Sequence, residues 1–141
     1  MVSVKVVSRY TGTPPRDGEA RAISGGPLYP VGEVLELLKN AGDGAVCPWT
    51  RKCIADLQQL ALDGSDLVLF LRETLTKGRF LGAEWCQQKP DGPWVASDAY
   101  VLTRQEWVPT ANRNIAMAYY LKFAIGKSGV ILLLVSCHLS T

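Results

Sequence analysis

Residues 115–138, with the sequence IAMAYYLKFAIGKSGVILLLVSCH, decide the fold of this chain. Large apolar side chains alternate with small or polar ones over residues 115–125, which is typical of a strand with one face on a core. A second apolar run over residues 130–138 predicts a neighbouring strand. Glycines at both ends of residues 126–129 predict a hairpin connection between the two.

The two faces of the first strand carry different chemistry. The face expected to meet the core is built from large apolar side chains: Ile115, Met117, Tyr119, Leu121, Phe123 and Ile125. The other face has alanines around Tyr120 and Lys122, which leaves room for an anion beside a phenol and an ammonium. The second strand ends at His138, the only histidine of the chain. A tyrosine, a lysine and a histidine within reach of one sheet surface suit chemistry on a phosphodiester.

The preceding part of the chain predicts three helices and two further strands. The first helix is expected from near Val31 to Asn40-Ala41-Gly42, the second from near Pro48 with Thr50 as its cap, and the third from a Ser65 cap to about Leu75. Residues 79–86 and 94–103 have the patterns of strands. One face of the latter strand carries Trp94, Ala96, Asp98, Tyr100 and Leu102. The expected fold class is α+β, with three N-terminal helices packed on one side of an antiparallel sheet.

The N-terminal part has a different composition. Residues 2–10 are expected to form a short strand. Residues 11–27 contain three prolines and four glycines, which indicates a loop or a mobile arm. We therefore expect residues 1–28 to be a strand followed by a flexible arm, and residues 29–141 to form one domain.

The composition excludes several classes of protein. With 48% hydrophobic and 20% charged residues, the chain of 141 residues can form one compact core and is not wholly disordered. A net charge of +2 permits contact with nucleic acid without demanding it. The four cysteines form no CxxC pair and stand beside a single histidine, so we expect no metal and no cofactor. No segment approaches the roughly 20 apolar residues of a membrane span, and we expect a cytoplasmic protein without a membrane partner.

Several dispersed motifs occur in a recognisable order. They are the helix that ends in Asn40-Ala41-Gly42, Thr50-Arg51 followed by Asp56 and Leu60-Ala61-Leu62-Asp63, Trp94 with Asp98-x-Tyr100, and Tyr120-Leu121-Lys122 followed by Val135-Ser136. In order and spacing, this set resembles the MqsR family of bacterial toxins from about Tyr29 to the end of the chain.

The resemblance implies a fold akin to the RelE-type ribonucleases, pairing with a cognate antitoxin protein, and cleavage of messenger RNA without a metal ion. The family's catalytic tyrosine falls on Tyr120, and Lys122 also matches. Two lysines of the family are replaced, one by Gly82 and the other by His138. A histidine near the C-terminus resembles the solution used by some RelE-type relatives.

Metal-free cleavage of RNA requires a base for the 2′-OH proton, a cation for the charge on phosphorus and an acid for the leaving oxygen. We expect Lys122 and Arg104 to hold the phosphate. We expect His138 to act as the acid, since imidazoles titrate near neutral pH. The base is left open between Asp98 and Glu84. Tyr120 is expected to stack on a nucleobase or to donate to phosphate. Four further basic residues are expected to contact RNA: Lys77, Arg79, Arg113 and Lys127.

Each of these assignments has a structural alternative. His138 at a strand end can be a structural side chain, and Tyr120 with Lys122 can belong to an ordinary exposed sheet face. For Trp94 and Trp107 we favour packing in the core or at its rim over stacking with nucleobases.

A second function, of another class, is suggested by the end of the second predicted helix. Gln59, Leu60 and Leu62 resemble the short peptide by which bacterial replication proteins dock on the DNA sliding clamp, with Asp63 where an aromatic residue is preferred. Two leucines in an apolar pocket and a glutamine at its rim would bind in this way, as in a toxin of the SocB type that blocks replication. The same leucines can instead be the core of a helix-end turn. A binding protein with neither activity is the third possibility.

Overall fold

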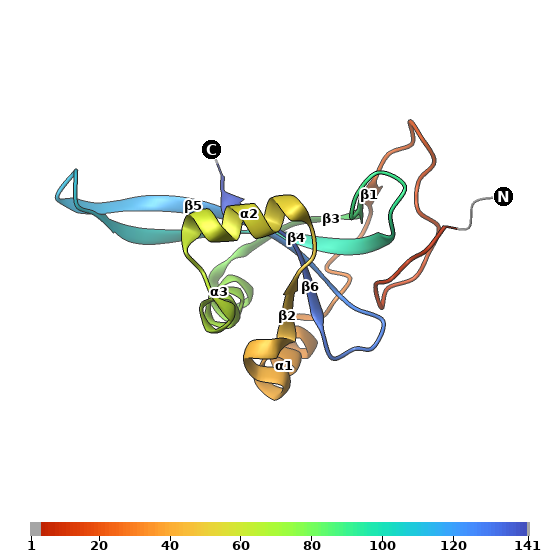
Figure 1. Ribbon diagram of the computed structural model, residues 1–141, viewed down its shortest axis with the longest axis horizontal. Coiled ribbons are helices and arrows are strands. Elements are labelled where there is room, and N and C mark those ends of the chain that lie inside the picture. Colours follow the sequence, from red (N-terminus) through yellow and green to blue (C-terminus); the bar gives the residue numbers. More distant parts are fainter. Residues whose placement is uncertain (1–3, 141) are drawn as a thin grey trace.

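The fold is α+β, and the computed structural model describes residues 4–140. Its elements are β1 (Ala22–Ile23), α1 (Val31–Ala41), the 3₁₀ helix η1 (Gly42–Ala45), β2 (Val46–Pro48), α2 (Arg51–Leu60), α3 (Gly64–Lys77), β3 (Arg79–Gln87), β4 (Trp94–Val108), β5 (Arg113–Ile125) and β6 (Leu132–Leu139). The strands form one sheet of six in the order β1-β3-β4-β5-β6-β2 (Figure 1). All neighbours are antiparallel except β2, which runs parallel to β6.

One face of the sheet forms the core with the helices. Leu121 and Phe123 of β5 are fully buried, and Tyr119 packs edge-on against Phe70 of α3 with ring centroids 5.0 Å apart. Buried side chains from all three helices belong to the same apolar cluster. The predicted alternation along β5 is therefore confirmed up to Lys122. A register shift between Lys122 and Phe123 follows, and beyond it Ala124 is buried as well.

The helix boundaries follow from local capping. Thr50 caps α2, since its Oγ1 accepts a 3.1 Å hydrogen bond from the backbone N–H of Cys53. The cap of α3 is Asp63, not the expected Ser65. Asp63 and Asp66 each accept a hydrogen bond from the other's backbone N–H, which is a reciprocal capping box.

The N-terminal segment differs from the prediction. Residues 4–10 form no continuous strand, only isolated bridges from Val6 to Trp94 and from Ser8 to Gly126, and residues 1–3 lie outside the described part. The expected loop at 11–27 contains the two-residue strand β1, which pairs with the outer edge of β3. The missed strand β2 is only three residues long and directly precedes α2, so it is too short to show an alternating pattern.

The far halves of β4 and β5 project beyond the other strands as a two-stranded ribbon, on the left of Figure 1. The first residue of β3, Arg79, pairs with Val101, and the last of β6 pairs with Tyr119. From Thr103 to Val108, β4 therefore pairs only with β5. Among residues 4–140, no helix is long and apolar enough to cross a membrane.

Candidate functional site on the open face of the sheet

The sheet face opposite the helices carries a row of four cross-strand residues, with polar side chains from β3, β5 and β6. Arg79 pairs with Val101, Val101 with Tyr120, and Tyr120 with His138. Directly paired residues point to the same side of a sheet, so these four share one face. The next row joins Ala99, Lys122 and Ser136 in the same way.

Tyr120 and His138 form the centre of the row. Their rings stack with centroids 5.3 Å apart and planes at 25°. Nδ1 of His138 lies 2.9 Å from the carbonyl oxygen of Leu139, which can only accept, so Nδ1 carries the proton. Nε2 is thereby left as the nitrogen that can exchange a proton with a substrate.

Lys122 supplies the cation of the cluster. Its Nζ lies 5.8 Å from the centroid of the Tyr120 ring and donates a 2.6 Å hydrogen bond to Oε1 of Glu84 on β3. Burial by itself would lower the pKa of Lys122, but Cys86 and the hydrogen bond to Glu84 outweigh it and raise this pKa to about 12. The ammonium is therefore charged at neutral pH and is suited to hold an anion, not to remove a proton.

The phenol of Tyr120 is a hydrogen-bond donor at neutral pH. Burial raises its pKa, and the positive charge of Lys122 offsets the rise only in part. The hydroxyl therefore keeps its proton, and Tyr120 can donate to a phosphate or stack on a base without acting as a general base.

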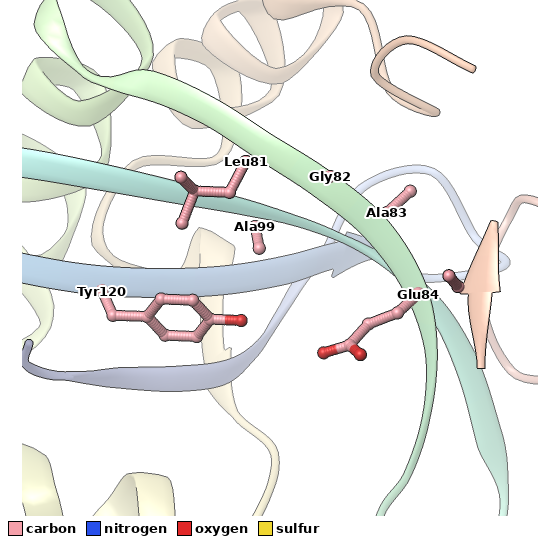
Figure 2. A pocket seen from close by; sticks show the side chains of 7 residues that line it. Leu81, Gly82, Ala83, Glu84, Ala99 and Tyr120 are labelled. Carbon is pink, nitrogen blue, oxygen red and sulfur yellow. The ribbon is translucent and has the colours of Figure 1, made fainter. Parts of the chain in front are cut away.

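A shallow hollow of about 200 Å³ adjoins Tyr120. It is lined by Ala22, Leu81, Gly82, Ala83, Glu84, Ala99 and Tyr120. Figure 2 shows the Tyr120 hydroxyl pointing into this space toward the Glu84 carboxylate. Beside the hollow, β3 bulges between Phe80 and Gly82, and the backbone of Gly82 has φ +153°, a value that L side chains rarely adopt. An isolated glycine within a strand is a sequence signal for a bulge, but the strand pattern of residues 79–86 was not interpreted in this way.

Arg104 lies on the other face of the sheet, so its expected place beside Lys122 is wrong. Its guanidinium lies 5.0 Å from the centroid of the Phe70 ring on α3 and forms ion pairs of 3.5 Å with Glu73 and 3.7 Å with Glu106. Five residues separate Arg104 from Ala99, the partner of Lys122, and an odd separation places the two side chains on opposite faces. The side chain of Arg104 therefore packs against α3 and holds the sheet to the helix layer.

Asp98 is also excluded from the cluster. It is fully buried on the helix side, where its two carboxylate oxygens accept hydrogen bonds of 2.9 and 3.0 Å from the backbone N–H groups of Leu28 and Tyr29. Burial raises the pKa of Asp98, and the two N–H groups counteract the rise only in part. Of the two candidate bases, only Glu84 therefore lies at the cluster.

The four basic residues expected to contact RNA lie at separate places. Arg79 belongs to the row with Tyr120, is exposed, and forms no ion pair within residues 4–140. Lys77 ends α3, whereas Arg113 and Lys127 lie at opposite ends of β5. Only Arg79 is thus part of the Tyr120 surface.

The segment that resembles the clamp peptide forms a helix end. Gln59 is exposed, but Leu60 and Leu62 pack against the core around Ala61, whose backbone is left-handed with φ 56°. This geometry supports the interpretation as a helix-end turn, because docking would require the leucines to leave the core. Asp63, where the peptide prefers an aromatic residue, is explained by its capping of α3. Clamp binding stays a prediction.

The two tryptophans expected to pack in the core or at its rim differ. Trp94 lies at the rim, with the guanidinium of Arg21 over its ring at 5.1 Å. Trp107 is 58% exposed near the tip of the β4–β5 ribbon, so the prediction of packing is wrong for this residue. Among the described residues, no three His, Cys, Asp or Glu side chains are grouped so that they could hold a metal ion.

No family model, no curated protein and no solved structure matches the chain.

Proposed function

We propose that the open face of the sheet binds single-stranded RNA and cleaves it without a metal ion, and that the protein is the growth-inhibiting toxin of a toxin–antitoxin module. The substrate is messenger RNA, and the proposed protein partner is a cognate antitoxin that neutralises the toxin. The single observation that carries the proposal is the convergence of Tyr120, Lys122 and His138 on one accessible surface, with Glu84 in hydrogen-bond contact with Lys122.

These side chains meet the three chemical requirements of RNA cleavage. Glu84 takes the proton of the ribose 2′-OH, and the 2′ oxygen then attacks the adjacent phosphorus. Lys122 stabilises the negative charge that develops on the phosphoryl oxygens. The bond from phosphorus to the 5′ oxygen breaks, and protonated His138 supplies the proton of that leaving oxygen from Nε2. The products are a 2′,3′-cyclic phosphate and a free 5′-OH.

Tyr120 and Arg79 have supporting roles in this scheme. Arg79 lies in the same cross-strand row as Tyr120, where its guanidinium can pair with a neighbouring phosphate. Tyr120 donates a hydrogen bond from its hydroxyl to the phosphate or stacks on a base next to the reacting bond. The stacking of its ring on His138 holds the imidazole in place.

Induction in growing bacteria tests the proposal. Pulse-labelling of RNA, protein and DNA synthesis should show an early loss of protein synthesis, because messenger cleavage stops translation first. The variant His138→Ala should grow normally. An early and selective loss of DNA synthesis would contradict the proposal and would favour the clamp instead.

A further inference from the structure

The open face of the sheet continues beyond the Tyr120 cluster along the β4–β5 ribbon. By strand alternation, the side chains on this continuation are Thr103, Gln105 and Trp107 of β4 and Asn114, Ala116 and Ala118 of β5. We call this set the ribbon strip. All of its members except Ala118 are exposed, and none is charged. The strip is therefore an uncharged surface that begins beside Tyr120 and ends at an exposed indole.

The charges around the ribbon strip favour a polyanion. Arg79 lies in the row that adjoins its inner end, and Lys122 lies in the next row on the same face, whereas Arg113 at the outer end has the parity of the helix side. The nearest acidic side chains are already neutralised, since Glu84 pairs with Lys122 and Glu106 pairs with Arg104. A strand of phosphates would thus meet cations at the inner end of the strip and no carboxylate among the side chains of the strip itself.

The spacing of the two aromatic residues fits several nucleotides. Six residues of β4 separate Trp107 from Val101, the partner of Tyr120. At roughly 3.3 Å per residue, this is about 20 Å along the strand. A stacked strand of nucleic acid advances roughly 3.4 Å per nucleotide, so the gap corresponds to about six nucleotides.

We infer that single-stranded RNA runs along the ribbon strip from the Tyr120 cluster to Trp107, whose indole stacks on a nucleobase several positions from the cleaved bond. The inference rests on the proposed function, because the RNA enters the strip from that cluster. Aromatic platforms beside backbone-binding cations are the usual means of holding single strands without reading their sequence. A protein partner is less well matched, since Trp107 is the only large apolar side chain of the strip.

Binding of RNA that cannot be cut tests the inference separately from cleavage. The probes are 2′-O-methyl oligouridylates of about two to about ten nucleotides, labelled for fluorescence anisotropy. For the unmodified protein, affinity should rise in a step when the oligomer reaches about six nucleotides. Trp107→Ala should remove the step and weaken binding of the longer oligomers about 5- to 150-fold. Trp107→Phe should retain most of the step and most of the affinity, because a phenyl ring can also stack on a base.

Two controls keep the outcomes distinct. Leu69→Ala removes an equally exposed apolar side chain from α3, on the helix side, and should leave the step unchanged. Binding of the dinucleotide should be the same in Trp107→Ala and the unmodified protein, because that ligand reaches only the Tyr120 cluster.

Unchanged affinity of Trp107→Ala for every oligomer would overturn the inference even if the protein cuts RNA. The same result combined with loss of binding to the antitoxin would assign Trp107 to a protein interface. Failure of the unmodified protein to bind any oligomer would overturn both the inference and the proposed function. If affinity rises in a step with oligomer length but the protein never cuts RNA, the result would support RNA binding on the ribbon strip. It would contradict only the proposed nuclease activity.

Discussion

Oε1 of Glu84 accepts a 2.6 Å hydrogen bond from Nζ of Lys122, on the sheet face opposite the helices. The side chain of Lys122 is 14% exposed and that of Glu84 is 36% exposed, so the carboxylate is the member of the pair that solvent and ligands reach more easily. This arrangement gives the two residues different roles in the proposed reaction: Lys122 holds charge, and Glu84 moves a proton.

Substitution of Glu84 separates these roles. Glu84→Gln keeps a hydrogen-bond acceptor for Lys122 and removes the base, so cleavage should fall about 10²- to 10⁴-fold. Affinity for uncleavable RNA should be equal or higher, because a negative charge has left the surface. The matched control is Glu106→Gln on the helix side, which should cut at the normal rate. Normal cleavage by Glu84→Gln in a rapid-quench assay would refute the assignment of the base.

The two faces of the sheet can be distinguished with a pair of arginine variants. Arg79→Ala should weaken RNA binding and reduce the slope of log affinity against log salt by about 1, as expected for loss of one phosphate contact. Arg104→Ala should leave both quantities unchanged and should instead lower stability, because Arg104 packs on Phe70 and pairs with Glu73. Reversed effects in a salt titration would mean that RNA binds the helix side.

The bulge in β3 depends on a glycine. Gly82→Ala should cost roughly 1–3 kcal/mol of stability through its backbone conformation alone. An added Cβ would meet nothing within 4 Å, so no steric clash contributes to this cost. Urea denaturation measures the cost, and Gly26→Ala, at a glycine with equally open space and without a positive φ, is the control. Equal stability of the two variants would show that the bulge does not require glycine.

The buried carboxyl of Asp98 predicts a pH dependence of stability. Because burial raises its pKa in the folded protein, the neutral form is favoured there. The stability that this raised pKa contributes is fully present below the pKa that Asp98 has in the unfolded chain. It is lost as the pH rises through the higher pKa that Asp98 has in the folded protein. The difference in free energy of unfolding between the unmodified protein and Asp98→Asn should therefore grow as the pH is lowered toward the ordinary aspartate pKa of about 3.9. A difference that shrinks on acidification would mean that the N–H groups of Leu28 and Tyr29 dominate.

The sequence predicts the strands best where one face is strongly apolar. The alternation around Tyr120 and Lys122 identified both faces of β5, and the convergence with His138 follows from the hairpin register. The strand pattern also puts Asp98 and Tyr100 on one face of β4, and the even spacing puts Arg104 on that same face, which in the structure is the helix side.

Other features depend on tertiary contacts that leave little trace in the sequence. Strand β2 is defined by its parallel pairing with β6, and β1 by its pairing with the edge of β3. The exposure of Trp107 arises because neither β3 nor β6 extends along the ribbon, and strand length is not encoded in the residue itself. Tryptophan is usually well buried, so composition alone predicted the opposite.

The central claim is that the Tyr120 cluster cuts RNA, and cleavage of a short synthetic RNA by the purified protein tests it most directly. The account predicts fragments that end in a 2′,3′-cyclic phosphate and a 5′-OH, no cut at a linkage whose 2′-OH is replaced by hydrogen, and loss of activity in a folded His138→Ala, Tyr120→Phe double variant. RNA that stays intact with excess protein, or equal cleavage by the double variant, would contradict it.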